Sequence, residues 1–385
     1  MEYIYMDNAA TTKVDSRVKE IMNKFLDDEY ANPSSIHSMG NEGTKALEEA
    51  RKKVASLIGA EPKEIVFTSG GTESDNLAIK GAVWKNPGNH IITSCLEHPA
   101  VLKTCEYLEE NGYDVTYLDV DEHGLVDLDE FEDSIREDTV LASIMYANNE
   151  IGTIEPIEEL VKIAHEHDVL FHTDAVQAVA KAHIDVKEED IDLFSISGHK
   201  IHAAKGIGAL YIKDGVDIEP LQHGGAHEHG LRAGTENVPG IVGLGEACRI
   251  AEEEMDDYIP EMKRLRDKLI EGIDEKIEKS YLNGHPTKRL VNNVNFSFEA
   301  VEGESILLQM DSKGIEASTG SACSSKKLEP SHAILALGRD EELAHSSIRL
   351  TIGKYTKEDE VDKVLEVLPD IISNLRSMSP LWEGN

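Results

Sequence analysis

A lysine between two apolar runs is the first candidate for chemistry in this sequence. Lys200 ends the run Ser197-Gly198-His199-Lys200, which follows the apolar residues 193–196 and precedes a second apolar run, 207–212. The two runs predict short buried strands. Burying an ammonium group is costly unless it is paired or neutralised. Lys200 is therefore either neutralised as a Schiff base with an aldehyde, or a surface lysine in a loop between strands.

A glycine-rich turn is the second candidate. The predicted strand 65–68 runs into Ser69-Gly70-Gly71-Thr72, and a predicted helix continues to residue 82. A strand, a glycine turn and a helix start together expose backbone N–H groups and the positive end of the helix dipole to an anion. The sequence lacks the Walker pattern, so it predicts either a phosphate site of another kind or an ordinary strand–helix turn.

The remaining candidates follow from the order of the predicted elements. Strands near 90–94, 114–119, 139–147 and 169–174 alternate with helices, which predicts a mostly parallel α/β sheet covered on both faces. Ligands of such sheets bind at the carboxyl ends of the strands. The polar residues at predicted strand ends are Thr72, His98, Asn149, Asp174 and Lys200.

These residues match the needs of one cofactor. Pyridoxal phosphate requires a lysine for its aldehyde, a carboxylate that keeps the pyridine nitrogen protonated, and a helix start for its phosphate. Lys200, Asp174 and the turn at Thr72 supply one group of each kind.

Composition limits the other classes of function. The 385 residues carry a net charge of −36, which disfavours nucleic acids and anionic membranes as partners. Cys95, Cys105, Cys248 and Cys323 are scattered without a CxxC pair, which predicts a reducing compartment, and we expect a cytoplasmic protein. We expect neither a signal peptide nor a membrane span. The histidines of segment 222–237 lack a second ligand cluster, so no intrinsic metal site is expected.

A long helical stretch, about 240–279, separates the alternating elements from an α+β final third. We place a domain boundary inside it. The predicted large domain spans 13–255, and the small domain combines 1–12 with 256–385.

The sequence resembles the NifS/IscS-type cysteine desulfurases, a class-V aminotransferase family of fold-type I pyridoxal-phosphate enzymes. The resemblance runs nearly end to end and rests on DNAATT (7–12), NPSSIH (32–37), FTSGGTESDN (67–76), EHPAV (97–101), NNEIG (148–152), DAVQ (174–177), SGHK (197–200), KGIGALY (205–211), RAGTEN (232–237), SACSS (321–325) and HSSIRLTIG (345–353). It implies a large domain with a mostly parallel seven-stranded sheet flanked by helices, and a smaller α+β domain.

The resemblance also implies an activity and roles for matching residues. Members remove sulfur from L-cysteine, release L-alanine and carry the sulfur as a cysteine persulfide for iron–sulfur cluster assembly. Lys200 would form the Schiff base, and His98 would stack on the ring and assist proton transfer. The implied cofactor contacts are Gly71, Thr72, His98, Asn149, Asp174, Gln177, Ser197, His199, Lys200 and Thr235, and the implied substrate contacts are Asn32 and Arg349.

Cys323 would be the nucleophile, in a loop of small residues. The resemblance implies a homodimer, with Thr235 reaching the phosphate of the other subunit. It also implies an iron–sulfur scaffold protein as acceptor, where Cys323 would contact the scaffold-bound cluster. On the residues alone, Asp174 could instead be a helix cap, His98 a structural histidine and Arg349 a strand-edge arginine in a salt bridge.

Rival functions remain at this stage. One is a selenocysteine lyase or another fold-type I enzyme, and another is a non-catalytic scaffold-binding homologue. The presence of Lys200, Asp174 and Cys323 argues against the second. The chain departs from the common family pattern at His202-Ala203-Ala204-Lys205 and at His229, which removes no chemical group that the mechanism needs.

Overall fold

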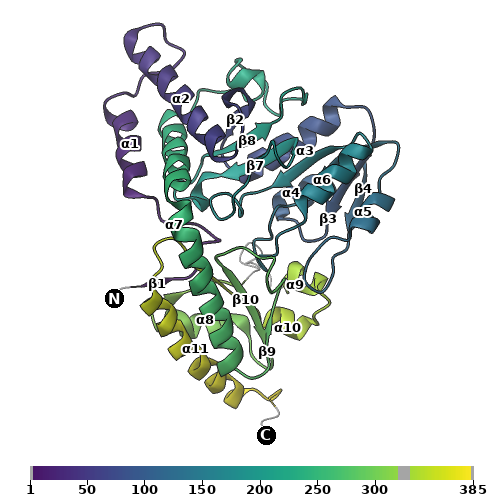
Figure 1. Ribbon diagram of the computed structural model, residues 1–385, viewed down its shortest axis with the longest axis vertical. Coiled ribbons are helices and arrows are strands. Elements are labelled where there is room, and N and C mark those ends of the chain that lie inside the picture. Colours follow the sequence, from purple (N-terminus) through teal and green to yellow (C-terminus); the bar gives the residue numbers. More distant parts are fainter. Residues whose placement is uncertain (1–2, 320–329, 383–385) are drawn as a thin grey trace.

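The apolar runs of the sequence form a seven-stranded main sheet in the computed structural model, which describes residues 3–319 and 330–382. Its order is β2-β8-β7-β6-β5-β3-β4, in the upper part of Figure 1. β8 is antiparallel to β2 and β7, and the other neighbours are parallel. The strands are β2 (Ile65–Thr68), β3 (His90–Ser94), β4 (Asp114–Leu118), β5 (Thr139–Ser143), β6 (Leu170–Asp174), β7 (Leu193–Ser197) and β8 (Gly208–Ile212). The predicted mostly parallel seven-stranded sheet is confirmed.

Both faces of the main sheet are buried under helices. Ile65 and Phe67 of β2 pack in one apolar cluster with Leu47, whereas Val66 packs in another with Leu77. This alternation is what a pleated strand requires when neither face meets water. The helices are α1 (Ser16–Asp27), α2 (Ser38–Leu57), α3 (Gly71–Lys85), α4 (Pro99–Glu110), α5 (Leu128–Asp133), α6 (Ile157–Glu166) and α7 (Val238–Lys276).

A second, small sheet has the order β12-β10-β9 and is antiparallel. Its strands are β9 (Ser280–Leu282), β10 (Asn293–Phe298) and β12 (Ile348–Thr351), and α8 (Gly303–Asp311), α9 (His332–Ala336), α10 (Glu341–His345) and α11 (Glu358–Met378) lie in the same lower part of the molecule (Figure 1). The first strand, β1 (Ile4–Tyr5), pairs in parallel with β11 (Ile315–Glu316). Met6 is fully buried in the apolar cluster of this part.

Helix α7 connects the two parts. It has 39 residues, so it is about 58 Å long, and Figure 1 shows it running from the main sheet to the small sheet. The division of the chain near residue 255 remains a proposal, because α7 passes through that residue without a break. No helix among the described residues is long and apolar enough to cross a bilayer.

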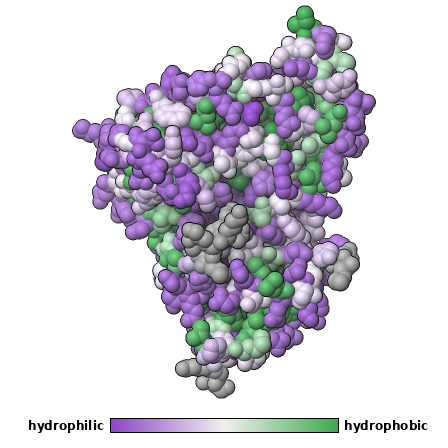
Figure 2. Space-filling view, turned by 180° about the vertical axis from the view of Figure 1, so that it is seen from behind, coloured by the Kyte–Doolittle hydropathy of each residue, from purple (hydrophilic) through white to green (hydrophobic). Residues whose placement is uncertain are grey.

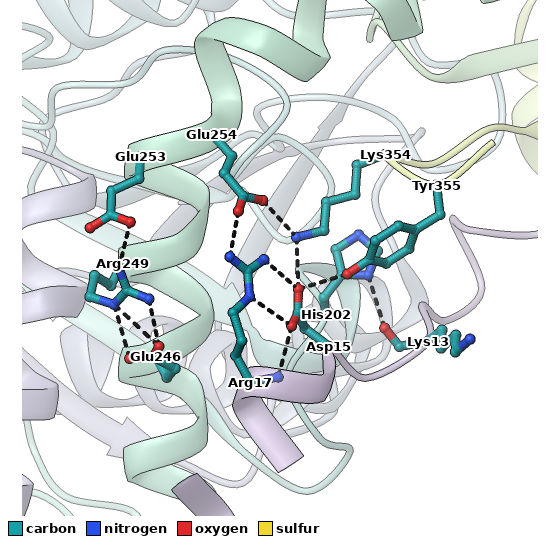
Figure 3. Close-up of polar contacts among 10 residues, drawn as sticks. All are labelled: Lys13, Asp15, Arg17, His202, Glu246, Arg249, Glu253, Glu254, Lys354 and Tyr355. Carbon is teal, nitrogen blue, oxygen red and sulfur yellow. Dashed lines mark hydrogen bonds and ion pairs between the residues drawn. The ribbon is translucent and has the colours of Figure 1, made fainter. Parts of the chain in front are cut away.

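A buried carboxylate joins the two parts beside α7 (Figure 3). Asp15 caps α1 and accepts hydrogen bonds from Arg17, from Lys354 Nζ at 3.1 Å and from the Tyr355 hydroxyl at 2.7 Å. Lys354 also reaches Glu254 of α7, at 3.3 Å. The Arg17 guanidinium, with the other donors, holds the pKa of Asp15 well below its usual range. Because Lys354 follows β12 closely, this network fixes one end of that strand to the large part of the molecule.

Candidate active site

A cavity of about 400 Å³ opens where polar residues follow the strands of the main sheet. It is lined by Ala9, Ala10, Gly71, Thr72, Asp75, His98, Met145, Ala147, Asn149, Asp174, Val176, Gln177, Ser197, His199, Lys200 and Arg349. Ten of the thirteen residues predicted to form the site are among them. They come from segments far apart in the sequence, so the fold assembles this site.

Lys200 reaches the cavity from a tight turn. Strand β7 is buried throughout and leads directly into the 3₁₀ turn Gly198–Lys200. A side chain at Gly198 would meet Ile207 at 2.9 Å, so the turn requires glycine. The Lys200 amine donates to the main-chain carbonyls of Ala9 and Ala10, the latter at 2.9 Å. Lys200 is therefore not a lysine of an exposed loop, and its amine points into a cavity.

The turn that leads into α3 supplies anion-binding groups. Helix α3 begins at Gly71, where a Cβ would meet the Val176 side chain at 2.8 Å. Glu73 accepts a hydrogen bond from the Ser69 N–H at 2.7 Å, which fixes the turn. Burial lowers the pKa of His199, further along the cavity wall, to about 4, so its imidazole is neutral. The helix start and the hydroxyls of Thr72 and Ser197 thus offer neutral donors to an anion, in the same cavity as the Lys200 amine.

Asp174 ends β6 and is almost fully buried. Its Oδ1 accepts the Val176 N–H at 2.9 Å, which orients the carboxyl group. Burial raises the pKa of Asp174, against the attraction of His98 and Lys200. A cationic ring nitrogen in this cavity would favour the ionised form and offset that effect.

His98 caps helix α4, as the structural alternative predicted, and it also lines the cavity. Its Nδ1 accepts the Ala100 N–H at 3.1 Å, so the neutral ring carries its proton on Nε2. Burial lowers the pKa of this imidazole. The cap thus fixes both the orientation and the tautomer of a ring that a ligand can meet.

Arg349 extends from β12 of the small sheet into the same cavity. Its Nη1 donates to the Asn149 carbonyl at 2.9 Å and its Nη2 to Asp7 at 3.0 Å. The side chain is 4% exposed, and its Nε has no hydrogen-bond partner among residues 3–319 and 330–382. The salt bridge of the structural alternative therefore exists, yet it leaves a buried donor for an anion.

The N-terminal segment contributes residues to the site that the sequence patterns do not indicate. The carbonyl of Ala9 accepts from Lys200 and, at 3.0 Å, from Gln177 Nε2, and Asp7 pairs with Arg349. The motif DNAATT was noticed, but a main-chain carbonyl has no signature in a sequence. Asp75 was also missed, although it lies within FTSGGTESDN. Its Oδ1 is buried without a hydrogen-bond partner, and burial raises its pKa well above the usual range.

Three predicted site residues do not line the cavity of the described chain. Asn32 is exposed, and its side chain accepts the Ser34 N–H at 2.8 Å. Thr235 is exposed as well. Cys323 lies outside the described residues. Their roles remain predictions. Across 3–319 and 330–382, the His, Cys, Asp and Glu side chains form no group of three or more able to hold a metal.

The cavity contains each kind of group that pyridoxal phosphate needs. Lys200 offers an amine for the aldehyde, and the α3 start offers N–H and hydroxyl donors for the phosphate. Asp174 offers a buried carboxylate for the ring nitrogen, and Gly71 leaves space where another side chain would collide with Val176. The residues present therefore fit this cofactor.

Comparisons with known proteins agree with this geometry. A family model described as aminotransferase class-V matches residues 4–364. A protein of Methanosarcina thermophila named cysteine desulfurase IscS is 56% identical over 380 residues, which cover 98% of this chain and 94% of that protein. One of the same name from Dictyoglomus turgidum is 54% identical over 387 residues, covering 99% and 98%.

Solved structures agree as well. A chain titled NifS-like protein has a TM-score of 0.90 at 40% identity, covering 97% of this chain and 100% of that one. A structure titled SspA in complex with cysteine has a TM-score of 0.81 at 39% identity, covering 92% and 99%. The cavity, the fold and these relatives together show that the chain belongs to the class-V aminotransferase family, among the NifS/IscS-type cysteine desulfurases.

Proposed function

We propose that this chain is a pyridoxal-phosphate-dependent cysteine desulfurase that passes the sulfur of L-cysteine, as a persulfide on Cys323, to an acceptor for iron–sulfur cluster assembly. The observation that carries the proposal is one cavity with Lys200, Asp174 and the start of α3 in its wall, in a chain 56% identical to a named cysteine desulfurase. A selenocysteine lyase is not named among the relatives described above.

Pyridoxal phosphate, when bound, would supply an aldehyde that an amine can hold and an electron sink for the carbon next to the bound amino group. Lys200 is the amine that would hold it. Lys200 Nζ is also the base placed to take the proton from the substrate Cα. The carbonyls of Ala9 and Ala10 lie within hydrogen-bond distance of Nζ and orient it for this transfer.

Arg349 is the residue that binds the substrate carboxylate. The ion pair with Asp7 and the hydrogen bond to Asn149 fix the guanidinium before the substrate arrives, and the unpartnered Nε is available as a donor. Arginine presents paired donors that match a carboxylate.

The group transfer needs no external oxidant. The Cys323 thiolate attacks the substrate sulfur, a sulfur–sulfur bond forms, and the carbon–sulfur bond breaks. The carbon keeps the bonding electrons, takes up a proton and leaves in L-alanine, while Cys323 holds the persulfide. Cys105 and Cys248 are buried, and burial raises the pKa of both thiols to about 12, so they cannot replace this nucleophile.

The activity is tested with purified protein, added pyridoxal phosphate and L-cysteine, by following alanine and protein-bound persulfide. The wild type should make both in equal amounts in the first turnover. Cys323→Ser should bind cofactor and cysteine but form no persulfide. Persulfide in that variant would assign the nucleophile to another thiol, and absence of alanine from the wild type would refute the activity.

A homodimer belongs to the proposal. Thr235 is exposed and outside its own cavity, as expected of a residue that serves a second copy. The connection between α1 and α2 also presents exposed apolar side chains, among them Tyr30 at 71% and Ile36 at 97% exposed. Figure 2 shows hydrophobic atoms at the tip of this projection. Burying such side chains against a second copy would stabilise a dimer.

Mixed dimers test this arrangement. In a dimer of one Lys200→Ala chain and one Thr235→Val chain, a residue that acts across the interface leaves one intact site. If Thr235 acts within its own chain, neither site is intact. Activity of the mixed dimer near half that of the wild type supports the exchange, and activity below that of the Thr235→Val homodimer contradicts it.

We assign the acceptor to an iron–sulfur scaffold protein, with Cys323 close enough to the scaffold to contact its cluster, and the location to the cytoplasm. The measurement is transfer of radiolabelled sulfur from cysteine to a scaffold protein, which should fail with Cys323→Ser. Label that remains on the enzyme would contradict this assignment.

A further inference from the structure

The described residues on either side of the segment that carries Cys323 are held in place by hydrogen bonds. Before it, the backbone of Ser318 pairs with that of Arg349, through N–H···O contacts of 2.6 and 3.2 Å. After it, Ser331 caps helix α9 and accepts the Ile334 N–H at 3.2 Å. The Ser331 hydroxyl also donates to the Glu150 carboxylate at 2.5 Å. Ser331 is therefore held by a carboxylate of another segment.

Glu150 belongs to the loop that links the cavity to the small sheet. Its main-chain carbonyl accepts from the side-chain amides of Asn293 at 3.2 Å and Asn295 at 3.1 Å, both on β10. The preceding residue, Asn149, lines the cavity and accepts from Arg349 Nη1 at 2.9 Å. Two neighbouring residues therefore make the two contacts, because Asn149 binds Arg349 and Glu150 binds Ser331.

These contacts form a continuous series. It leads from Ser318 to Arg349, and then through Asn149 and Glu150 to Ser331. Ser318 and Ser331, on either side of the segment that carries Cys323, are therefore both connected to Arg349, which we propose to bind the substrate. Glu150 is 6% exposed, and no Lys, Arg or His pairs with it within the parts of the chain that the structure describes. Among the described residues, the side chain that donates a hydrogen bond to the Glu150 carboxylate is that of Ser331. A buried carboxylate needs such donors, because burying its charge is costly.

We propose that Glu150 and Ser331 are positioning residues for sulfur transfer. Their contact holds Ser331, close to where the described chain resumes after the segment that carries Cys323, at a fixed place relative to Arg349 and a substrate bound there. This inference rests on the proposed desulfurase function. It differs from a purely structural role of the Ser331 cap. A structural cap would affect folding and all steps alike, whereas a positioning contact affects the meeting of the thiolate with the substrate sulfur.

Ser331→Ala is the first test, with Asp340→Ala as its matched control. Asp340 caps the neighbouring helix α10 by accepting the Leu343 N–H at 2.8 Å, and it does not line the cavity. Ser331→Ala should slow single-turnover formation of the Cys323 persulfide about 10- to 100-fold, because small misplacements of reacting groups have effects of that size. The visible absorbance of the bound cofactor and the KM for cysteine should stay within about twofold of the wild type. Asp340→Ala should transfer sulfur at the wild-type rate.

Conservative variants guard against simple unfolding. Ser331→Thr keeps the hydroxyl and should restore the rate to within about threefold, and Glu150→Gln keeps an acceptor and should fall between wild type and Glu150→Ala. The double variant Glu150→Ala/Ser331→Ala should be no slower than the slower single variant, since both lose one contact.

The outcomes are distinct. A wild-type rate of persulfide formation in Ser331→Ala would overturn the assignment, as would a loss of cofactor absorbance in step with the loss of rate. A rate in Asp340→Ala as low as in Ser331→Ala would also overturn it. Absence of cysteine-dependent persulfide from the wild type would instead refute the proposed function.

Discussion

Arg349 and Asn149 are 200 positions apart in the chain, and they meet through a hydrogen bond of 2.9 Å from the guanidinium to the main-chain carbonyl. The contact joins the small sheet to the cavity wall of the main sheet. Asp7 holds the other end of the guanidinium at 3.0 Å. These two contacts orient the guanidinium that we propose to bind the substrate carboxylate, and such preorganisation lowers the entropic cost of binding.

Replacing Arg349 by lysine tests whether paired donors are needed. Arg349→Lys keeps one positive charge but loses the planar fork, so the KM for cysteine should rise roughly 10- to 100-fold, as expected for one lost charge-assisted hydrogen bond. Steady-state kinetics measure the change, and cofactor content and Tm serve as controls. An unchanged KM would place the carboxylate site elsewhere.

Lys200→Ala should remove the visible absorbance that a Schiff base with pyridoxal phosphate gives, because no amine would then hold the aldehyde. Lys181→Met is the matched control. Lys181 is buried beside the Lys200 main chain, where its Nζ lies 3.4 Å from the Lys200 carbonyl oxygen, and burial lowers its pKa to about 7. The control should keep the absorbance. Normal absorbance in Lys200→Ala would reject the assignment of the cofactor lysine.

Glu155 should make stability depend on pH. Burial raises its pKa to about 8 in the folded chain, well above the value near 4.5 expected when unfolded. Its contribution to stability is therefore full below about pH 4.5 and is lost as the pH rises through about 8. Relative to Glu155→Gln, the wild type should lose up to about 1.4 kcal/mol per pH unit across this window. Unfolding in urea at several pH values measures the difference, and parallel curves for both proteins would contradict it.

A buried ion pair should stabilise the position of the glycine-rich segment that precedes Thr235. Arg51 donates to both oxygens of Glu228 at 2.8 Å, and the Phe67 N–H donates to one of them at 2.8 Å. Glu228→Gln removes the buried counter-charge of Arg51, which keeps only the exposed Glu48 at 3.4 Å, and should lower the free energy of unfolding by about 3–5 kcal/mol. The control Glu49→Gln, in an exposed pair with Lys52, should change the free energy of unfolding far less. Equal effects of the two changes would show that burial is not decisive.

Local patterns were sufficient for much of the site. The apolar runs around Lys200 form β7 and β8, and the glycine turn after residue 68 leads into α3 as predicted. The strand predicted for 139–147 ends at Ser143, although Ile144 and Tyr146 still donate to the carbonyls of His172 and Asp174 at 3.1 and 2.9 Å. After Ser143 the chain turns toward Asn148 and leaves the regular strand ladder, although its residues remain apolar. Hydrophobicity therefore predicts burial of this stretch but not the residue at which strand pairing ends.

The contacts that complete the site could not be predicted from local patterns. Lys200 and Gln177 meet at the carbonyl of Ala9, and Arg349 pairs with Asp7. The segment that makes these contacts pairs with parts of the chain that lie far apart from it in the sequence, through β1 with β11 and through Asp7 with Thr351. Such pairings follow from the whole fold. The predicted roles of Thr235 and Asn32 in the site cannot be derived from local patterns either, because neither side chain lines the cavity of one chain.

The position of β1 has a consequence for biosynthesis. Residues 4–10 are translated before the rest of the site, yet Ile4 pairs with Ile315 and Asp7 with Thr351. This segment must therefore wait, without its strand partners, until residue 351 has been translated. The main sheet can form earlier, since its strands come from residues 65–212. The carbonyls that orient Lys200 thus reach their place late, and a nascent chain truncated before residue 315 should acquire the main sheet without a finished active site.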